Sequence, residues 1–208
     1  MQKPAETQSP IHELLRIRWS PRAFSERTVE ADKLRSLWEA ARWAPSSANE
    51  QPWQFIVATK ENPAEFERLL NCIVESNRRW AFRAPVLSLS VARLKFEDDG
   101  KPNRHAFHDV GLATENLIIQ ATALGLFVHP MAGFHAQKAR EEFKVPEGYE
   151  PVAMMTIGYA GEPSVLPDDL RKRELKPRQR KPIDAFVFAG TWGQPSPLAN
   201  PSGKQTLE

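Results

Sequence analysis

The segment from residue 106 to 124 constrains the fold of this 208-residue chain more than any other. Its apolar residues recur at spacings of three and four, the pattern of a helix with one face on a core. The stripe comprises Val110, Ala113, Leu117, Ala121 and Leu124, and Leu112, Ile118 and Ile119 widen it. Gly125 follows where a C-terminal cap is expected. Because so wide an apolar surface must be covered, we expect this helix at the centre of the fold.

Shorter apolar patterns predict further helices and strands around this helix. Helices are expected over residues 11–18, 29–43, 63–77 and 136–143, and strands over 54–59, 86–92 and 152–159. The first strand is apolar on both faces, which is typical of a strand covered on both sides. Because helices separate the strands, the order indicates a mixed α and β domain.

Length and charge exclude several classes of protein. With 41% hydrophobic residues, 208 residues suffice for a sizeable core, and we expect one domain. The formal charge of +2 gives no global reason to expect a nucleic-acid or membrane partner. Cys72 is the single cysteine and lies on an apolar helix face, so we expect it buried, without a disulfide. No membrane span or signal peptide is recognisable, and we expect a cytoplasmic protein.

The loop from Ala44 to Trp53 joins a predicted helix to a predicted strand. Pro45 and Pro52 fix φ at their positions, and the short side chains between them can bond nearby backbone or a ligand. Loops held in one shape often carry function. The alternative is that the loop only ends a helix and begins a strand.

Two basic clusters lie near opposite ends of the chain. Pro21 favours an extended chain, in which Ser20 and Arg22 share a face that Arg18 can join. Guanidinium groups and a hydroxyl suit a phosphate, although such residues can also be merely solvated. The second cluster, residues 171–181, is followed by an apolar stretch, so we expect it to pack against something. A nucleic-acid patch is the alternative for this cluster.

Residues 93–107 are charged and read as a long exposed excursion, which is either disordered or functional. Phe96, His105, Phe107 and His108 are candidates for a pocket mouth. Gly133, in a segment with the bulky residues Met131 and Phe134, indicates a sharp turn or a close approach of the backbone to another group.

An ordered set of motifs resembles the nitroreductase family of FMN-dependent oxidoreductases, from about residue 11 to 193. The motifs are Arg18-x-Ser20-x-Arg22-x-Phe24, Ala44 to Trp53 leading into Phe55 to Ala58, Asn77 ahead of Ala84-Pro85, the Ala113 to Gly125 helix, Gly133-Phe134, and Arg178-x-Arg180 ahead of Pro182. The resemblance implies an α+β, three-layer fold with a mostly antiparallel central sheet flanked by helices. It further implies one domain over residues 1–208 and an intertwined homodimer with FMN at the interface, residues 161–208 extending around the partner.

The resemblance also implies which residues hold a tight, non-covalent FMN. The phosphate would be bound by Arg18, Ser20, Arg22, Arg178 and Arg180. The loop from the neighbouring subunit would supply Pro45, Ser46, Ser47 and Asn49. Asn77 would face the pyrimidine edge, and the backbone of Pro130, Ala132 and Gly133 would face flavin N5. Two positions depart from the family's usual pattern. Ala132 stands where Glu is frequent, so the acceptor pocket loses a charge, and Trp19 stands where a second basic residue is frequent, so the phosphate cluster loses a cation.

The activity implied is ping-pong transfer from NAD(P)H through FMN to a nitroaromatic, quinone or similarly electron-poor acceptor. No catalytic acid, nucleophile or metal ligand is expected, and Phe96, His105 and Phe107 are candidates for the acceptor pocket. One alternative is a flavin-binding protein of the same fold with other chemistry, such as dehalogenation or flavin breakdown. The other is a basic module that binds nucleic acid through residues 171–181. The physiological acceptor and the choice between NADH and NADPH are not readable from the residues.

Overall fold

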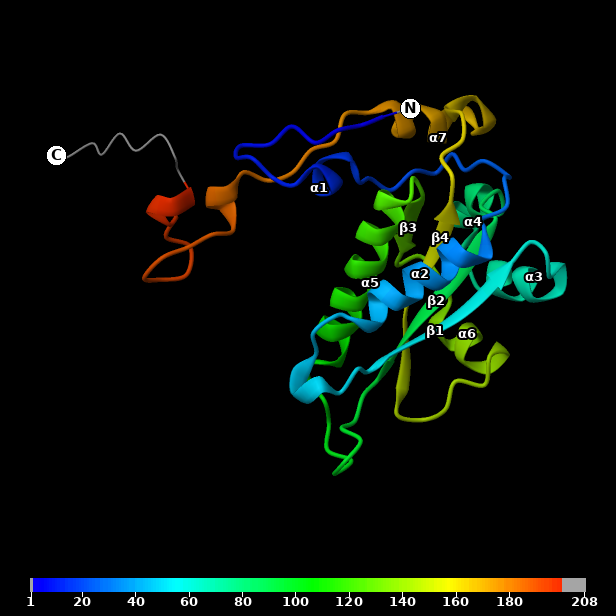
Figure 1. Cartoon of the computed structure of the whole chain (residues 1–208), viewed down its shortest axis with the longest axis horizontal. Coiled ribbons are helices and arrows are strands. Elements are labelled where there is room, and N and C mark those ends of the chain that lie inside the picture. Colours follow the sequence, from blue (N-terminus) through cyan, green and yellow to red (C-terminus); the bar gives the residue numbers. More distant parts are fainter. Residues whose placement is uncertain (1, 200–208) are drawn as a thin grey trace.

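Four antiparallel strands form the middle layer of the protein in the computed structural model, which describes residues 2–199 (Figure 1). The strands are β1 (Trp53–Thr59), β2 (Val86–Arg93), β3 (Phe127–Met131) and β4 (Tyr149–Gly158), in the order β1-β2-β4-β3. Trp53 pairs with Ala92 in the first ladder, and Phe127 pairs with Gly158 in the last. Strand β2 is buried along almost its whole length, as expected of an inner strand.

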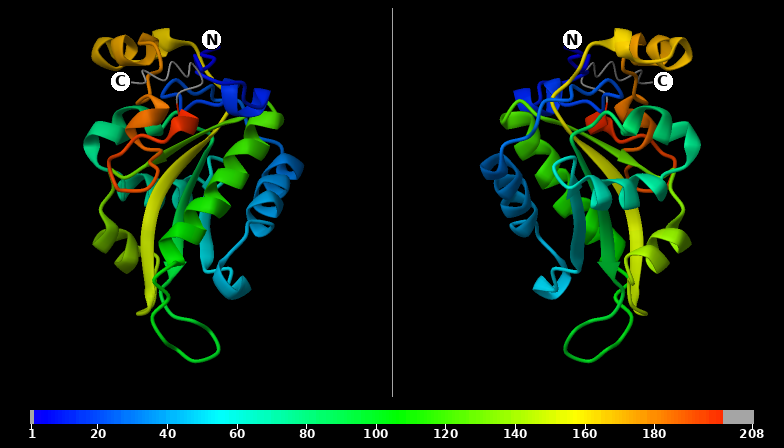
Figure 2. Two further views of the ribbon diagram at one scale, coloured as in Figure 1. Left: turned by 90° about the vertical axis from the view of Figure 1, so that its left-hand side faces the viewer. Right: turned by 90° about the vertical axis from the view of Figure 1, so that its right-hand side faces the viewer.

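Helices cover both faces of this sheet, which confirms the predicted α+β, three-layer architecture (Figure 2). The helices are α1 (Glu13–Ile17), α2 (Ala31–Arg42), α3 (Pro63–Asn71), α4 (Glu75–Ala81), α5 (Ala106–Ala123), α6 (Ala136–Glu142) and α7 (Asp168–Leu175). Short 3-10 turns cover Ser47–Asn49, Pro163–Val165, Ile183–Ala185 and Pro197–Ala199. Helices α2 and α5 share one core with the sheet, and α3, α4 and α6 share the other.

Helix α5 packs against both the sheet and α2, and its wide apolar surface is largely buried, as predicted. Ala113 and Leu117 are fully buried against the sheet, where β2 presents the small side chains of Ser88 and Ser90. Small residues on the strand let the helix approach closely. The remaining face of α5 stays open in the single chain, and Phe107 on it is 51% exposed.

One predicted helix was wrong in its extent, and two elements of the structure were not predicted. The helix expected over 63–77 is two helices, because Ile73 forms an isolated β-bridge with Phe134 and interrupts it, although the apolar spacing continues. Strand β3 was not predicted, since His129-Pro130 reads as a break; at the edge of the sheet a proline is tolerated. Helix α7 was missed because Leu170 is its one buried apolar residue.

The N-terminal segment and the stretch that follows α7 run side by side near one end of the sheet, and the segment after residue 182 projects away from the body (Figure 1). The expected C-terminal extension, residues 161–208, contains α7 and is described as far as residue 199. The expected excursion after β2 is observed as a protruding loop that ends at α5. Among residues 2–199, no helix combines the length and the apolar character that a bilayer crossing demands.

Candidate functional site

The arginines near opposite ends of the chain meet at one cavity of about 290 Å³. Its lining includes Arg18, Ser20, Arg22, Arg178 and Arg180, the five residues predicted to form a phosphate site. Residues that lie more than 150 positions apart in the sequence therefore face one ligand-sized space.

The backbone around this cavity is held by pairing between distant segments. Ser25 N–H donates to the Tyr159 carbonyl at 2.9 Å, and Gly161 N–H donates to the Ala23 carbonyl at 2.8 Å. A Cβ at Gly161 would lie 2.7 Å from the carbonyl carbon of Phe24, so only glycine allows this approach. The pairing fixes the extended segment that carries Ser20 and Arg22 to the end of β4.

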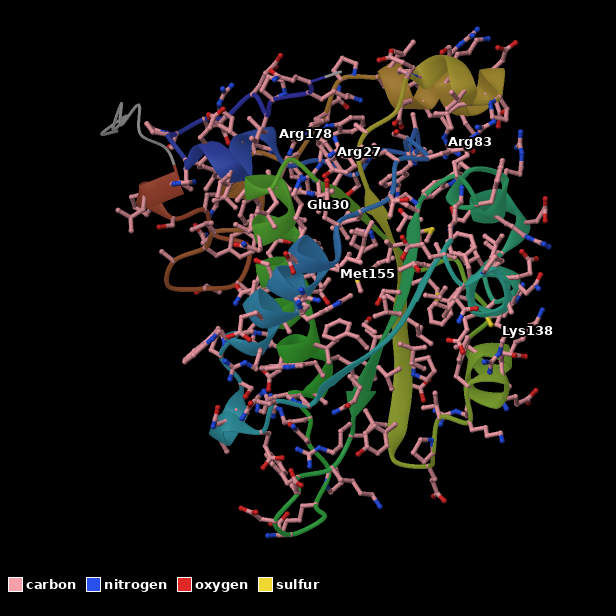
Figure 3. All side chains as sticks on the ribbon, turned by 45° about the vertical axis from the view of Figure 1, so that its right-hand side comes forward. Arg27, Glu30, Arg83, Lys138, Met155 and Arg178 are labelled. Atoms are coloured by element: carbon pink, nitrogen blue, oxygen red, sulfur yellow. The ribbon has the colours of Figure 1, made fainter. Side chains whose placement is uncertain are left out.

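Arg178 ties the C-terminal segment to the N-terminal one. Its Nη1 donates to the main-chain oxygens of Lys3 and Arg16, each at 2.9 Å. Figure 3 shows Arg178 beside the segment that contains α1. Burial lowers the pKa of Arg178, and the nearby cations Arg18 and Arg180 lower it further. The guanidinium therefore sits in a place where an added negative charge would be stabilising.

Glu174 is a buried carboxylate in the wall of the same cavity, and sequence reasoning missed it. Its Oε1 accepts hydrogen bonds from the main-chain N–H groups of Arg22 and Ala23, at 2.8 and 3.1 Å. Its Oε2 lies 3.6 Å from Nη1 of Arg22 and has no hydrogen-bond partner among the described residues. Glu174 thus positions the backbone and side chain of Arg22. No local sequence pattern distinguishes it from the exposed glutamates.

The cavity carries a large excess of positive charge. Seven cationic side chains line it and Glu174 is the only acidic one among its lining residues. The cations are Lys3, Arg18, Arg22, Arg173, Lys176, Arg178 and Arg180. Like charges this close repel one another, so the arrangement favours a bound anion with several oxygens. A phosphate group fits this donor set.

Asn77 and Gly133, both predicted site residues, contact each other. The Asn77 Nδ2 donates to the Gly133 carbonyl at 3.2 Å, and Val74 N–H donates to the same oxygen. A Cβ at Gly133 would lie 2.5 Å from Asn77 Nδ2, so the close approach predicted for this glycine is confirmed, here to a side chain. Pro130 lies in β3, and Ala132 follows the strand and is exposed. Within residues 2–199 no bond is found from the Ala132 or Gly133 N–H, which leaves both able to donate to a ligand.

The proline loop lies at the opposite end of α5 from the arginines (Figure 1). Ser47 N–H donates to Oδ2 of Asp109, which is buried in the first turn of α5. Gln51 N–H donates to the Ser46 hydroxyl oxygen. The structure therefore does not bring Pro45, Ser46, Ser47 and Asn49 to the arginine cavity within one chain.

The candidate acceptor-pocket residues Phe96, His105 and Phe107 lie in or beside the excursion, and none of them lines the arginine cavity. His108 is largely exposed, and its Nδ1 lies 2.9 Å from Oδ1 of the neighbouring, buried Asp109. A second, polar cavity of about 470 Å³ lies between the proline loop and the excursion.

Cys72 is buried as predicted, and burial raises the pKa of its thiol.

Known proteins resemble this chain in sequence. Residues 15–159 match the nitroreductase family. A Streptomyces coelicolor protein described as a putative NADH dehydrogenase/NAD(P)H nitroreductase is 30% identical over 182 residues, 77% of this chain and 87% of that protein. An uncharacterized 15.4 kDa protein of Mycolicibacterium smegmatis is 35% identical over 98 residues, 47% of this chain and 66% of that protein.

Solved structures share the fold. One described as an oxidoreductase containing FMN superposes with a TM-score of 0.85 at 34% identity, covering 90% of this chain and 95% of that chain. A nitroreductase family protein from Clostridium difficile 630 superposes with a TM-score of 0.66 at 27% identity, covering 86% of this chain and 96% of that chain.

Proposed function

The chain belongs to the nitroreductase family, and we propose that it is an FMN-dependent oxidoreductase that takes reducing equivalents from NAD(P)H. The main support for FMN as the cofactor is the cavity at which Arg18, Arg22, Arg178 and Arg180 converge. Support also comes from the 34% identical relative of known structure, which is described as containing FMN.

The residues present fit the mononucleotide. Charge-assisted hydrogen bonds contribute roughly 1.5 to 3 kcal/mol each, and micromolar affinity requires only about 8 kcal/mol. Several arginines on one phosphate, with burial of the flavin ring, are therefore enough without a covalent link. The phosphate would be held by Arg18, Ser20, Arg22, Arg178 and Arg180. Asn77 would face the pyrimidine edge, and the free main-chain N–H groups near Gly133 would donate to flavin N5.

Bound FMN supplies the hydride chemistry, and the chain supplies position and electrostatics. We propose that the acceptors are nitroaromatics, quinones or similarly electron-poor compounds, reduced in a ping-pong order in which NAD(P)H leaves before the acceptor binds. Ala132 leaves the acceptor side without a charged side chain at that position.

We further propose a homodimer in which the proline loop of each subunit completes the site of the other. Three observations support it. The proline loop lies far from the arginines of its own chain, and α5 has an open face that includes Phe107. The projecting C-terminal segment exposes 90% of Trp192 and 91% of Leu198. Exposed apolar side chains on this scale are typical of a subunit interface.

The test is optical. Purified protein should show a flavin spectrum, anaerobic NADH or NADPH should bleach it, and a nitroaromatic or quinone should restore it. A bound flavin that stays oxidised under excess NADH and NADPH would contradict the reductase and favour other flavin chemistry on this fold. A colourless protein that does not take up FMN would contradict the cofactor as well.

A further inference from the structure

The N-terminal segment, residues 2–10, contributes Lys3 to the lining of the arginine cavity. Ala5 N–H donates to the Arg16 carbonyl at 2.8 Å, and Ile183 N–H donates to the side-chain oxygen of Gln8 at 2.9 Å. Arg178 adds its bond to the Lys3 carbonyl. The segment is therefore held by both the α1 region and the C-terminal segment, and it runs beside the latter in Figure 1.

These bonds place the side chain of Lys3 in the lining of the cavity. Its Nζ lies 5.0 Å from the centre of the Trp19 ring and donates to the main-chain oxygen of Glu174 at 2.5 Å. An ammonium group has three donors, and this is the single hydrogen bond that Lys3 Nζ makes among residues 2–199. Two donors stay free for a ligand in the cavity that Lys3 lines.

The positive charges around Lys3 also favour a bound anion. Burial lowers the pKa of Lys3, Glu174 opposes that change, and the neighbouring Arg178 and Arg22 lower the pKa further. The ammonium is thus close enough to both arginines to feel their repulsion. One shared dianion placed among the three cations would relieve it.

We propose that Lys3 is a further phosphate-binding residue of this site, donating to the same phosphate group as Arg22 and Arg178. The inference rests on the proposed FMN function. It also changes one expectation for Trp19. Because Trp19 replaces a basic residue, the phosphate cluster was expected to have one cation fewer. The structure places the ammonium group of Lys3 over the Trp19 ring, so Lys3 supplies a cation at this point.

Riboflavin, which lacks the phosphate, separates this role from a structural one. Lys3→Met keeps an apolar stem over Trp19 and removes the charge, and Lys3→Arg retains the charge. Lys101→Met is the matched control, because Lys101 lies in the excursion with 77% of its side chain exposed. Each full-length protein would be stripped of flavin and titrated with FMN and with riboflavin, with the quenching of flavin fluorescence as the readout.

Lys3→Met should weaken FMN binding by roughly tenfold, as loss of one charged hydrogen bond implies. Riboflavin binding should be unchanged, Lys3→Arg should recover most of the affinity, and Lys101→Met should behave as wild type. Unchanged FMN affinity in Lys3→Met, or an equal loss for FMN and riboflavin, would overturn the role of Lys3 while leaving the FMN site intact. Failure of the wild-type protein to bind FMN would instead overturn the proposed function, and this inference with it.

Discussion

Arg93 uses one nitrogen, Nη2, to contact both the main-chain oxygen of Glu50 at 2.8 Å and its Oε2 at 2.9 Å. Their side chains are 15% and 10% exposed, so the pair is largely shielded from water. Arg93 ends β2, Glu50 belongs to the proline loop, and Arg93 Nη1 also reaches Glu97 in the excursion. One arginine therefore fixes the proline loop to the sheet and to the excursion.

Arg93→Gln should lower the free energy of unfolding by about 1 to 3 kcal/mol, because it leaves a shielded carboxylate without its partner. Urea denaturation would measure the change. Arg35→Gln is the control, since Arg35 and Asp32 form an exposed pair, 71% and 89% accessible. That substitution should cost under about 0.5 kcal/mol. Equal effects of the two substitutions would show that the Arg93 pair does not hold the loop.

Backbone strain in the proline loop leads to a second prediction. Ala48 has φ of 52°, in the left-handed region that disfavours residues with a Cβ, and Asn49 and Gln51 share that region. Ala48→Gly should therefore stabilise the protein by up to about 1 kcal/mol. Ala40→Gly, inside α2, should destabilise it by about 1 kcal/mol. Thermal unfolding of both variants would show whether the signs differ, and a loss in Ala48→Gly would argue against strain at this position.

His129 should make stability fall in mild acid. Burial lowers the pKa of its imidazole to about 4, from 6.5 for a free side chain, and its Nδ1 lies 2.8 Å from the Pro21 carbonyl. As pH falls below 6.5 the unfolded chain binds a proton that the folded state excludes until about pH 4, so stability is lost in this window. Between about pH 7.5 and pH 5 the loss from this group should reach about 2 kcal/mol.

Urea unfolding of flavin-free protein at both pH values would measure this loss. His129→Gln, which cannot take up the proton, should lose less stability than wild type over the same interval. A pH slope identical in the two proteins would show that His129 is not the group responsible.

The phosphate assignment predicts a large, ligand-specific loss in the double variant Arg22→Ala with Arg180→Ala. Removal of two charged donors should weaken FMN binding by roughly 10² to 10⁴-fold and yield apoprotein on purification. Riboflavin affinity should change little, because it has no phosphate. Full FMN occupancy in a folded double variant, checked by absorbance and circular dichroism, would disprove the assignment.

Gly133→Ala should impair the other end of the proposed flavin site. The new Cβ would meet Asn77 Nδ2 at 2.5 Å and Val74 Cγ2 at 3.0 Å, so the Asn77 amide must move. We expect FMN and riboflavin to weaken alike, by roughly tenfold, because the ring contact is lost and the phosphate contact is not. If FMN weakened while riboflavin did not, Gly133 would belong near the phosphate instead. Fluorescence titration with both ligands distinguishes the outcomes.

Much of the fold was predictable because its elements carry strong local patterns. The 106–124 helix, the strand after the proline loop and the strand from Val86 were recognisable from apolar spacing alone. The break between α3 and α4 was not, because Ile73 fits the apolar stripe of a continuous helix and lies outside both helices, where it forms a bridge with Phe134. Helix α7 was not predicted because its two buried side chains, Leu170 and Glu174, do not form an apolar stripe.

The residues of the candidate site were likewise predictable only in part. Arg18, Arg22, Arg178 and Arg180 were identified by their motifs, and the structure brings them to one cavity. Lys3 and Glu174 were not identified, because their neighbours in the sequence give them no distinguishing chemistry. Their mutual contact joins residues 171 positions apart.

The sequence by itself determined the central helix, three of the four strands, the proline loop and the charges the chain carries, because these depend on spacing and on side-chain chemistry over a few residues. The tertiary structure decided which charges face one another. The pairing of Ala23 with Gly161 and the bonds of Arg178 to Lys3 and Arg16 bring both ends of the chain to one cavity. Such long-range contacts arise from packing around the shared sheet, and no local pattern encodes them.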